Sequence, residues 1–208
     1  YPRNRGAIDG DVMTVTRPLT LLAAALLVLA GCASSPEPPE SSAAESSILA
    51  TYDLAGLDGR AIVDRLDRMP VADRRTTLRA SVRPGQLRLS EVGSDHQTAV
   101  DLPDDLFYLA VAPYLENTHD CYFHSLTTCR GELAGKDVHV TITERGTGNV
   151  LVDTTTTTFD NGFVGFWLPS GIDATITVAY ADYLASSDIS TGPDDPTCLT
   201  TLRLVRTT

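Results

Sequence analysis

The sequence predicts an α+β protein in which a small mixed α/β region is followed by an antiparallel, β-sandwich-like domain. Apolar residues recur at helical spacing over residues 57–69, whereas from Lys136 onward they alternate with polar residues, the period of a half-buried strand. Turn sequences such as the Asp-Asn-Gly at 160–162 separate the alternating segments, as in a sheet of short strands. We therefore expect a mixed region over 48–115 and a β domain over 116–208.

The first region should begin with an amphipathic helix that ends near Pro70. One face of this helix carries Leu57, Ala61, Ile62, Leu66 and Met69. The other face is expected to carry Asp58, Arg60, Asp64, Arg65, Asp67 and Arg68. Residues 71–75 have the composition of one further helical turn.

A β-hairpin is expected next, because two short segments over 78–90 flank the turn dipeptide Pro84-Gly85. The apolar segment from Phe107 to Tyr114 follows. Since proline cannot donate to a strand ladder, Pro113 indicates that this segment ends as a strand or lies at a sheet edge.

The second region has the clearest strand pattern of the chain. Val138, Val140 and Ile142 alternate with polar residues, and this pattern places His139 on the exposed face of a strand. Further strands are expected over 150–158, 163–168, 174–180 and 200–205. Trp167 lies between Phe166 and Leu168 and is expected in the core.

The N-terminal segment predicts export and a lipid anchor. Arg17 precedes a short apolar run over 19–30, which is typical of an export signal and too short for an ordinary spanning helix. The run ends in Leu-Ala-Gly-Cys, which resembles the lipobox of bacterial lipoproteins and implies cleavage before Cys32 and lipidation of that residue. We expect translation to start at Met13, residues 1–31 to be upstream sequence and signal peptide, and 32–47 to be a lipidated cysteine and disordered tether.

The composition excludes several classes of function. The net charge is -11, which argues against nucleic acid and anionic headgroups as partners and suits the attraction of cations. The chain has only two methionines, which excludes a methionine-rich copper site. It has no dinucleotide-binding fingerprint and no motif of a serine or zinc hydrolase.

The stretch from His119 to Cys129 is the strongest functional signal. It contains Cys121, His124 and Cys129, and Cys198 follows 69 residues after the last of these. Thiolates with a nearby imidazole suit Cu(I) or Zn(II). Two readings stay open beside copper: a structural disulfide, which would leave one thiol over, and a closed tetrahedral zinc site.

Other polar residues are weaker candidates. His119 is evenly balanced between a metal ligand and a solvated neighbour. His96 falls in a polar loop, and Asp194-Asp195 is expected to be a loop beside the site rather than a set of ligands for a hard metal. No catalytic residue and no organic cofactor is predicted.

The cysteine pattern and its neighbouring phrases resemble the CueP family of copper-binding periplasmic proteins or lipoproteins. The phrases are Gly-Glu-Leu at 131–133, Phe-Asp-Asn-Gly-Phe at 159–163 and the segment 190–198. The resemblance implies two domains and a dimerising N-terminal region. It also implies copper tolerance, and supply of copper to an exported copper/zinc superoxide dismutase. Its metal chemistry maps to Cys121, His124, Cys129 and Cys198.

The sequence therefore predicts an extracytoplasmic lipoprotein that sequesters or delivers Cu(I), held on the outer face of the cytoplasmic membrane or in the periplasm. Thiols placed to hold Cu(I) can also reduce Cu(II) while they form a disulfide, with Cys129 expected as the shared partner. The competing predictions are a thiol-redox metal reductase, which the absence of a Cys-x-x-Cys pair disfavours, and a surface module stapled by disulfides.

Overall fold

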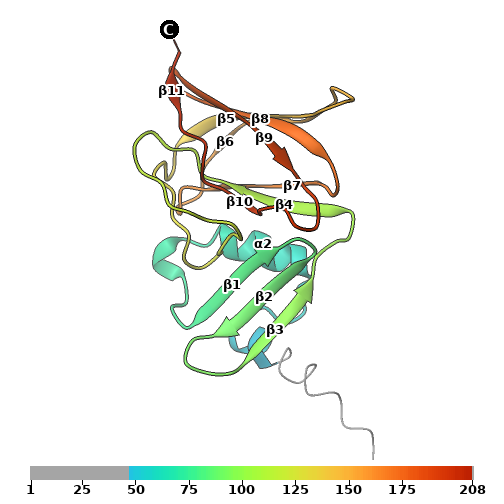
Figure 1. The fold of residues 1–208 in the computed structure, drawn as a ribbon. Helices are drawn as coiled ribbons and strands as arrows, with labels where there is room; N and C mark the ends of the chain where they lie inside the picture. The colour runs from blue at the N-terminus through green and yellow to red at the C-terminus, as the bar shows by residue number, and fades with distance from the viewer. Residues whose placement is uncertain (1–46, 208) are drawn as a thin grey trace, which may run out of the picture. The chain divides into compact units, whose positions relative to one another are not determined.

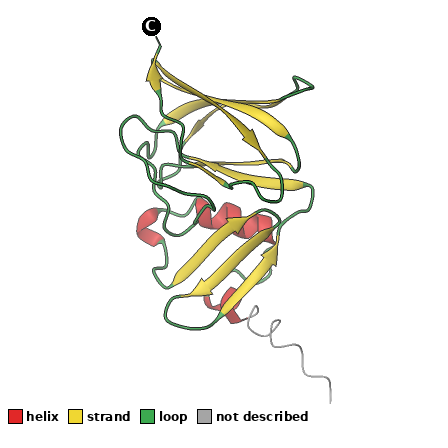
Figure 2. Ribbon diagram, in the orientation of Figure 1, coloured by secondary structure: helices red, strands yellow, loops and turns green. Residues whose placement is uncertain are grey.

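The computed structural model describes residues 47–207, which are mostly β-strands in three sheets with few helices (Figures 1 and 2). This arrangement agrees with the predicted α+β class. The elements are α2 (Gly59–Asp67), the 3-10 helix η1 (Val71–Asp73), β1 (Leu78–Arg83), β2 (Gln86–Glu91), β3 (Gln97–Asp101), β4 (Leu106–Val111), β5 (Asp137–Glu144), β6 (Val150–Thr157), β7 (Val164–Pro169), β8 (Asp173–Tyr180), β9 (Tyr183–Ser190), β10 (Cys198–Leu199) and β11 (Val205–Arg206).

The first sheet has the order β1-β2-β3 and packs with α2 (Figure 1). Asp58 caps the start of the helix: its side chain accepts a 2.8 Å hydrogen bond from the backbone N–H of Ala61 and so satisfies one of the unpaired donors of the first turn. The apolar face of α2, Ile62, Val63 and Leu66, is buried in a core with the inward residues of β1 and β2. The predicted helix, the following turn and the hairpin are thereby confirmed.

The middle sheet has the order β10-β4-β7, with β4 parallel to β10 and antiparallel to β7. Because successive side chains of a strand point to opposite faces, β4 contributes to two cores. Tyr108 and Ala110 face the core shared with α2 and the first sheet, whereas Phe107, Leu109 and Val111 face the core under the third sheet. The strand falls within 48–115 in sequence and pairs with partners from 116–208.

The third sheet has the order β11-β9-β8-β5-β6. Its inward residues, among them Val140, Ile176 and Val178, pack over Leu109 and Leu168 of the middle sheet. The burial of β5 alternates as the sequence pattern predicts, and His139 on this strand is 49% exposed at its side chain.

Several elements differ from the sequence prediction. Two strands, β3 and β9, were not expected, because polar residues interrupt the apolar pattern of both segments. The predicted strand over 200–205 is replaced by the two-residue strands β10 and β11 with irregular backbone between them. Trp167 was expected in the core and is only partly buried against it, with its indole N–H donating a 2.9 Å hydrogen bond to Asp64. Within 47–207 no helix is long and apolar enough to cross a membrane; the predicted signal, Cys32 and tether lie outside the described residues, except for position 47.

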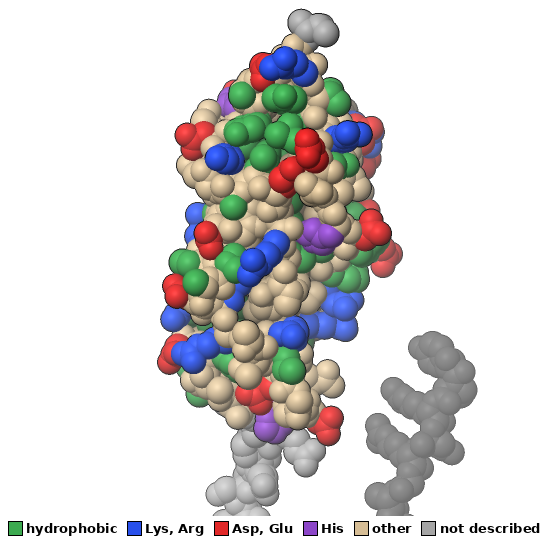
Figure 3. Space-filling model, turned by 90° about the vertical axis from the view of Figure 1, so that its left-hand side faces the viewer, with side chains coloured by type: hydrophobic (Ala, Val, Ile, Leu, Met, Phe, Trp, Pro, Cys, Tyr) green, Lys and Arg blue, Asp and Glu red, His purple; other side chains and the backbone are tan. Residues whose placement is uncertain are grey.

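The positive charge of the chain is unevenly distributed. Half of its arginine and lysine residues, eight of sixteen, lie between Arg60 and Arg88. In the space-filling view most of the basic side chains gather over the part of the molecule that contains α2 and the first sheet (Figure 3). The negative charge of the protein is therefore carried mainly by the remaining surface.

Candidate metal centre

The segment from Cys121 to Cys129 is an irregular loop that runs along the free edge of β1. The backbone N–H of Val82 donates to the carbonyl of His124 at 2.9 Å, and that of Leu126 donates to the carbonyl of Ala80 at 2.9 Å. Ser125 forms an isolated bridge with Ser81 between these bonds. The loop thus adds a short extra strand to the first sheet, and this pairing fixes the position of the His124 backbone.

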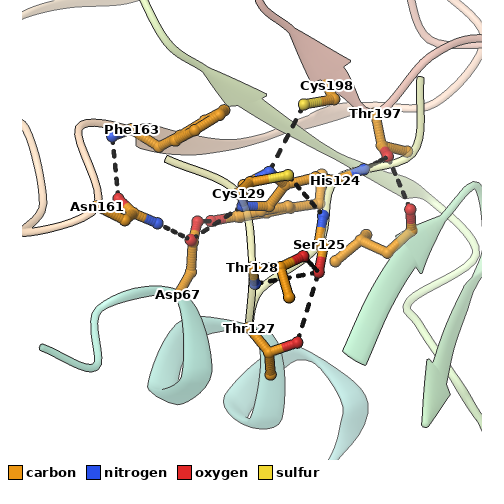
Figure 4. Close-up of polar contacts among 12 residues, drawn as sticks. Asp67, His124, Ser125, Thr127, Thr128, Cys129, Asn161, Phe163, Thr197 and Cys198 are labelled. Atoms are coloured by element: carbon orange, nitrogen blue, oxygen red, sulfur yellow. Dashed lines mark hydrogen bonds and ion pairs between the residues drawn. The ribbon is translucent and has the colours of Figure 1, made fainter. Parts of the chain in front are cut away.

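Thr197 ties the same loop to β10. Its hydroxyl accepts a 3.0 Å bond from the backbone N–H of His124 and donates a 2.7 Å bond to the carbonyl of Val82 (Figure 4). The next residue, Cys198, pairs with Ala110 of β4. One buried hydroxyl therefore sets the distance between the loop and the cysteine that is far away in sequence.

The structure brings together the four ligand residues predicted from the sequence. The ligand atoms of Cys121, His124, Cys129 and Cys198 all lie within 4.8 Å of one another, and only Cys121 is not buried. The sulfurs of Cys121 and Cys129 are 3.5 Å apart, and Nδ1 of His124 is 3.7 Å from the sulfur of Cys198. Three sulfurs and one imidazole nitrogen at these distances form a donor set that fits a soft metal ion.

Two of the three thiols are joined in a disulfide, between Cys121 and Cys198. Cys129 is buried and is the free cysteine among residues 47–207. The expectation that Cys129 is the shared disulfide partner is therefore wrong for this state. Sequence proximity suggested Cys129, but the register of β10 on β4 places Cys198 against Cys121.

The histidine of the cluster is held by a carboxylate that the sequence analysis missed. Nε2 of His124 lies 3.0 Å from Oδ1 of Asp67, and neither side chain is exposed to solvent. Asp67 also accepts hydrogen bonds from the hydroxyl of Tyr108 at 2.5 Å and the amide of Asn161 at 2.9 Å (Figure 4). Asp67 was expected on the polar face of α2. Its position four residues after the buried Val63 was the signal that it faces the core.

The contact between His124 and Asp67 favours the charged form of each group. Burial lowers the pKa of His124, but the charge and hydrogen bond of Asp67 outweigh it and raise that pKa to about 9. Burial likewise raises the pKa of Asp67, yet the contacts with His124, and then those with Tyr108 and Asn161, bring it below its ordinary value. Since Nε2 is bound to Asp67, Nδ1 is the nitrogen that faces the sulfurs.

The free thiol has an environment that favours its thiolate. Burial raises the pKa of Cys129, but hydrogen bonds and charge from His124 and a hydrogen bond from His119 lower it to about 7. The backbone N–H of Ser125 also points to this sulfur, at 3.4 Å. A thiolate is the form that binds soft metals and attacks disulfides.

The turn from Phe159 to Phe163 explains the Phe-Asp-Asn-Gly-Phe phrase. Asn161 orients Asp67, and the ring of Phe163 packs on the ring of His124 with centroids 4.6 Å apart. Gly162 has φ +80° and lies against Gly131, where a Cβ on Gly131 would come 2.7 Å from the Gly162 carbonyl oxygen. Only glycines allow this approach, which brings the turn to the end of the cysteine loop.

The remaining polar candidates lie outside the group of four. His96 is exposed and contacts Glu91. Asp195 accepts a 2.6 Å bond from the backbone N–H of Gly192, so it shapes the loop before β10. His119, for which both alternatives were left open, is half-buried, and its ring centroid lies 6.2 Å from that of Phe163.

Comparisons with known proteins show the family of this chain. The family model described as periplasmic copper-binding protein CueP matches residues 61–203. The crystal structure of S.CueP is similar, with 38% sequence identity, a TM-score of 0.72 and coverage of 77% of this chain and 97% of that chain. No curated protein matches the chain. The family model spans more than half of the sequence, and the chain therefore belongs to the CueP family of periplasmic copper-binding proteins.

Proposed function

We propose that the protein binds Cu(I) as a cargo ion through Cys121, Cys129 and Cys198, assisted by Nδ1 of His124. The observation that carries this proposal is that ligand atoms from the cysteine loop and from the start of β10 lie within 4.8 Å of one another. Cu(I) prefers two or three thiolates and tolerates imidazole. Because the centre is largely buried, the bound ion would be shielded from solvent.

The disulfide of Cys121 and Cys198 makes this binding depend on redox state. The three-thiolate set exists only after the disulfide accepts two electrons and two protons. In the reverse direction, the two thiols give up two electrons and two protons, form the disulfide, and reduce two Cu(II) to two Cu(I). Cu(II) reduction by Cys121 and Cys198 is therefore a proposed secondary activity of the same centre.

The central experiment is an anaerobic titration of the reduced protein with Cu(I) against a competing chelator. We expect one high-affinity site, and we expect Cys198→Ser to weaken binding as much as Cys121→Ser despite its distance in sequence. His139→Gln serves as a control, because this histidine is on the exposed face of β5. Parent-like affinity of Cys198→Ser would show that the three-thiol model is wrong.

Cu(II) reduction is tested by mixing anaerobic reduced protein with Cu(II) and trapping Cu(I) with a chromogenic chelator. About two Cu(I) per new disulfide are expected, and mass spectrometry should map that disulfide to Cys121 and Cys198. Equal Cu(I) formation by a variant with all three cysteines changed to serine would assign the reduction to another source.

The cellular role follows from the location predicted by the sequence. We propose a lipid anchor on Cys32 and delivery or sequestration of copper outside the cytoplasm, with an exported copper/zinc superoxide dismutase as recipient and a homodimer as the assembly. Cys32→Ala should move the protein from the membrane to the soluble fraction or leave an unprocessed precursor. Unchanged membrane fractionation of Cys32→Ala would remove the anchor from the proposal.

The second candidate function is purely structural: the disulfide between Cys121 and Cys198 would only stabilise the fold. In that case the two cysteines serve only to join the loop to β10. Protein that remains fully oxidised as isolated, and whose reduced form ignores copper, would favour the staple over the copper centre.

A further inference from the structure

We propose that the solvent-facing side of the first sheet is a docking groove for an acidic protein surface, which belongs to the protein that exchanges copper with the centre. The groove is defined by Arg79, Arg83 and Arg88, which line a hollow beside the cysteine loop. The inference rests on the proposed function for its cargo, and it adds the chemistry of the partner and the place where the partner binds.

The groove follows from the alternation of side chains along β1 and β2. The core side of β1 is apolar and buried, so Arg79, Ser81 and Arg83 point to the opposite side of the sheet. Arg88 of β2 pairs with Ser81 and, on its other side, with Ala99 of β3, and so shares this side. Because serine and alanine are small, they leave a hollow of about 450 Å³ that the three arginines line.

The positive charge of this groove is not neutralised within residues 47–207. None of the three arginines forms an ion pair with a carboxylate of these residues, although the protein has 27 acidic residues against 16 basic ones. Nε of Arg88 donates at 3.1 Å to the neutral side chain of Gln86. Nε of Arg83 is buried and has no hydrogen-bond partner in the described part of the chain, which is uncommon in folded proteins. Unpaired arginines on one face are complementary to a negatively charged partner.

The groove adjoins the candidate metal centre. Ser81 forms its bridge with Ser125 of the cysteine loop, and the guanidinium carbon of Arg83 lies 4.3 Å from the ring centroid of Phe123. The carbonyl oxygen of Phe123 is 3.6 Å from the sulfur of Cys121. Cys121 is the one residue of the group of four that is not buried. A partner bound to Arg83 would therefore lie next to the most accessible sulfur of the centre.

The aromatic residues beside the groove favour a protein as the partner. Tyr122 is 55% exposed, its hydroxyl donates to the backbone carbonyl of Asp194, and its ring centroid lies 4.9 Å from that of Phe123. Tyrosine, phenylalanine and arginine are the residue types enriched where proteins bind proteins. A membrane or a nucleic acid would extend beyond the groove and meet the acidic remainder of a protein whose net charge is -11. A local group of carboxylates on a partner protein avoids that repulsion.

The first experiment measures, by fluorescence anisotropy, the binding of a labelled oligoglutamate peptide to the full chain in its disulfide form, with an oligoglutamine peptide as the neutral control. The affinity for oligoglutamate should fall by up to about five-fold in Arg83→Gln and in Arg88→Gln, the range for one exposed ion pair. Combined with Arg79→Gln, the loss should reach about 10- to 100-fold if the three effects add.

Arg60→Gln is the matched control for charge. Arg60 belongs to α2, on the core side of the sheet, and its guanidinium lies over the ring of Trp167. This variant should bind oligoglutamate like the parent. Arg88→Gln keeps the test valid if Arg83→Gln fails to fold, because Arg88 is exposed. An oligoglutamate affinity that is unchanged in the triple variant would overturn the inference.

The second experiment asks whether docking serves copper exchange. The acceptor is a Cu(I)-binding peptide with two cysteines, made with either a glutamate tail or a glutamine tail. The Cu(I)-loaded parent should transfer copper about 10-fold faster to the acceptor with the glutamate tail, at the low end of the range for electrostatic steering. The triple arginine variant should lose this difference. Equal rates with both tails in the parent would overturn the assignment of the partner as a copper-exchanging protein.

Two further measurements identify other occupants of the groove. Arginine-dependent binding to vesicles of phosphatidylglycerol and phosphatidylcholine, without binding of oligoglutamate, would replace the acidic protein with a membrane surface. Self-association that is lost in the triple variant, measured by sedimentation, would replace it with a second copy of this chain. Either result would overturn the inference.

The peptide experiment needs no copper, and this separates the inference from the proposed function. Reduced protein that binds Cu(I), in a chain whose oligoglutamate binding does not depend on the three arginines, would refute this inference alone. Arginine-dependent binding of oligoglutamate by a chain whose reduced form fails to bind Cu(I) would refute the copper proposal, while the acidic docking groove would stand.

Discussion

At the scale of single residues, Asp67 is the side chain on which the candidate centre depends most. A carboxylate without solvent contact is costly unless it is paired and hydrogen-bonded, and Asp67 has three hydrogen-bonding neighbours: His124, Tyr108 and Asn161. These neighbours come from the cysteine loop, from β4 and from the turn before β7. The carboxylate thus joins three segments beneath the sulfurs and sets which nitrogen of His124 faces them.

We expect Asp67→Asn to destabilise the fold and weaken Cu(I) binding. Removal of one partner leaves the imidazolium uncompensated, and a broken buried pair costs about 3–5 kcal/mol of unfolding free energy. Cu(I) affinity should fall about 10- to 100-fold, as for other groups that orient a metal ligand. Chemical denaturation and a competitive Cu(I) titration measure the two effects.

Asp64→Asn is the matched control, because Asp64 lies on the same helix and accepts a hydrogen bond from Trp167, away from the sulfurs. Its Cu(I) affinity should equal that of the parent. Equal losses of affinity in both variants would mean that the effect comes from helix α2 in general and not from the orientation of His124.

At the scale of elements, Glu132 closes the segment that carries the cysteine loop. Its Oε2 accepts hydrogen bonds from the backbone N–H groups of Leu115 at 2.6 Å, Glu116 at 3.0 Å and Asn117 at 3.4 Å. Its slight burial raises the pKa, but these three donors lower it below the usual value of 4.5. The exposed carboxylate of Glu132, which follows the cysteine loop, is therefore hydrogen-bonded to the backbone of residues 115–117, which precede the loop.

This arrangement predicts a pH dependence of stability. Because the folded-state pKa of Glu132 is depressed, its stabilising effect is fully present above about pH 4.5 and is lost as the pH falls through the folded-state value. Glu132→Gln should be less stable than the parent at neutral pH, and the difference should shrink in acid. Thermal unfolding from pH 3 to pH 7 measures it.

Glu116→Gln removes the same charge from the same segment and should leave this pH dependence intact. A constant difference between Glu132→Gln and the parent across the whole pH range would contradict the role assigned to the carboxylate.

The sequence predicted elements whose signal is local and missed those that depend on distant partners. Alternation at Val138, Val140 and Ile142 predicted β5, and Pro84-Gly85 predicted the first hairpin. Strand β9 was missed because its three serines and one aspartate obscure a pattern in which only Ala185 and Ile189 are buried. It is a strand because β8 and β11 pair with it.

For the candidate site, too, local signals were predicted from the sequence and contacts between distant residues were not. The four candidate ligand residues were predicted from their spacing and from the family resemblance, and the structure brings them together. Asp67 could not be assigned to His124 from the sequence, because 57 positions separate them. The choice of Cys198 as the partner of Cys121 depends on the pairing of β10 with β4, which only the fold decides.

At the scale of the whole molecule, the disulfide joins the loop to the strand β10 across 77 residues of sequence. Such a link stabilises the fold mainly because it restricts the unfolded chain, by about 2–4 kcal/mol in typical cases. Since β4 contributes side chains to both cores, the loss of this link is expected to lower the stability of residues 47–207 as one unit.

A reductant should therefore lower the midpoint of thermal unfolding by about 5–15 °C, given the stability effect of one disulfide and the size of the domain. Cu(I) added to the reduced protein should restore the midpoint, because a ligand of the folded state stabilises it. Calorimetry with and without reductant tests this. Cys129→Ser should keep the response to reductant and Cys198→Ser should lose it; a response in Cys198→Ser would locate the effect elsewhere.

The pairing of the cysteine loop with the edge of β1 affects how readily the protein can aggregate. The outer edge of β1 would otherwise present unpaired N–H and C=O groups, which invite another chain to add a strand. Here the backbone of residues 124–126 occupies that edge through Val82 and Ala80. A protein that loses both disulfide and metal would release the loop and uncover the edge. Reduced, metal-free molecules should therefore be the species that associate first and that quality-control proteases recognise.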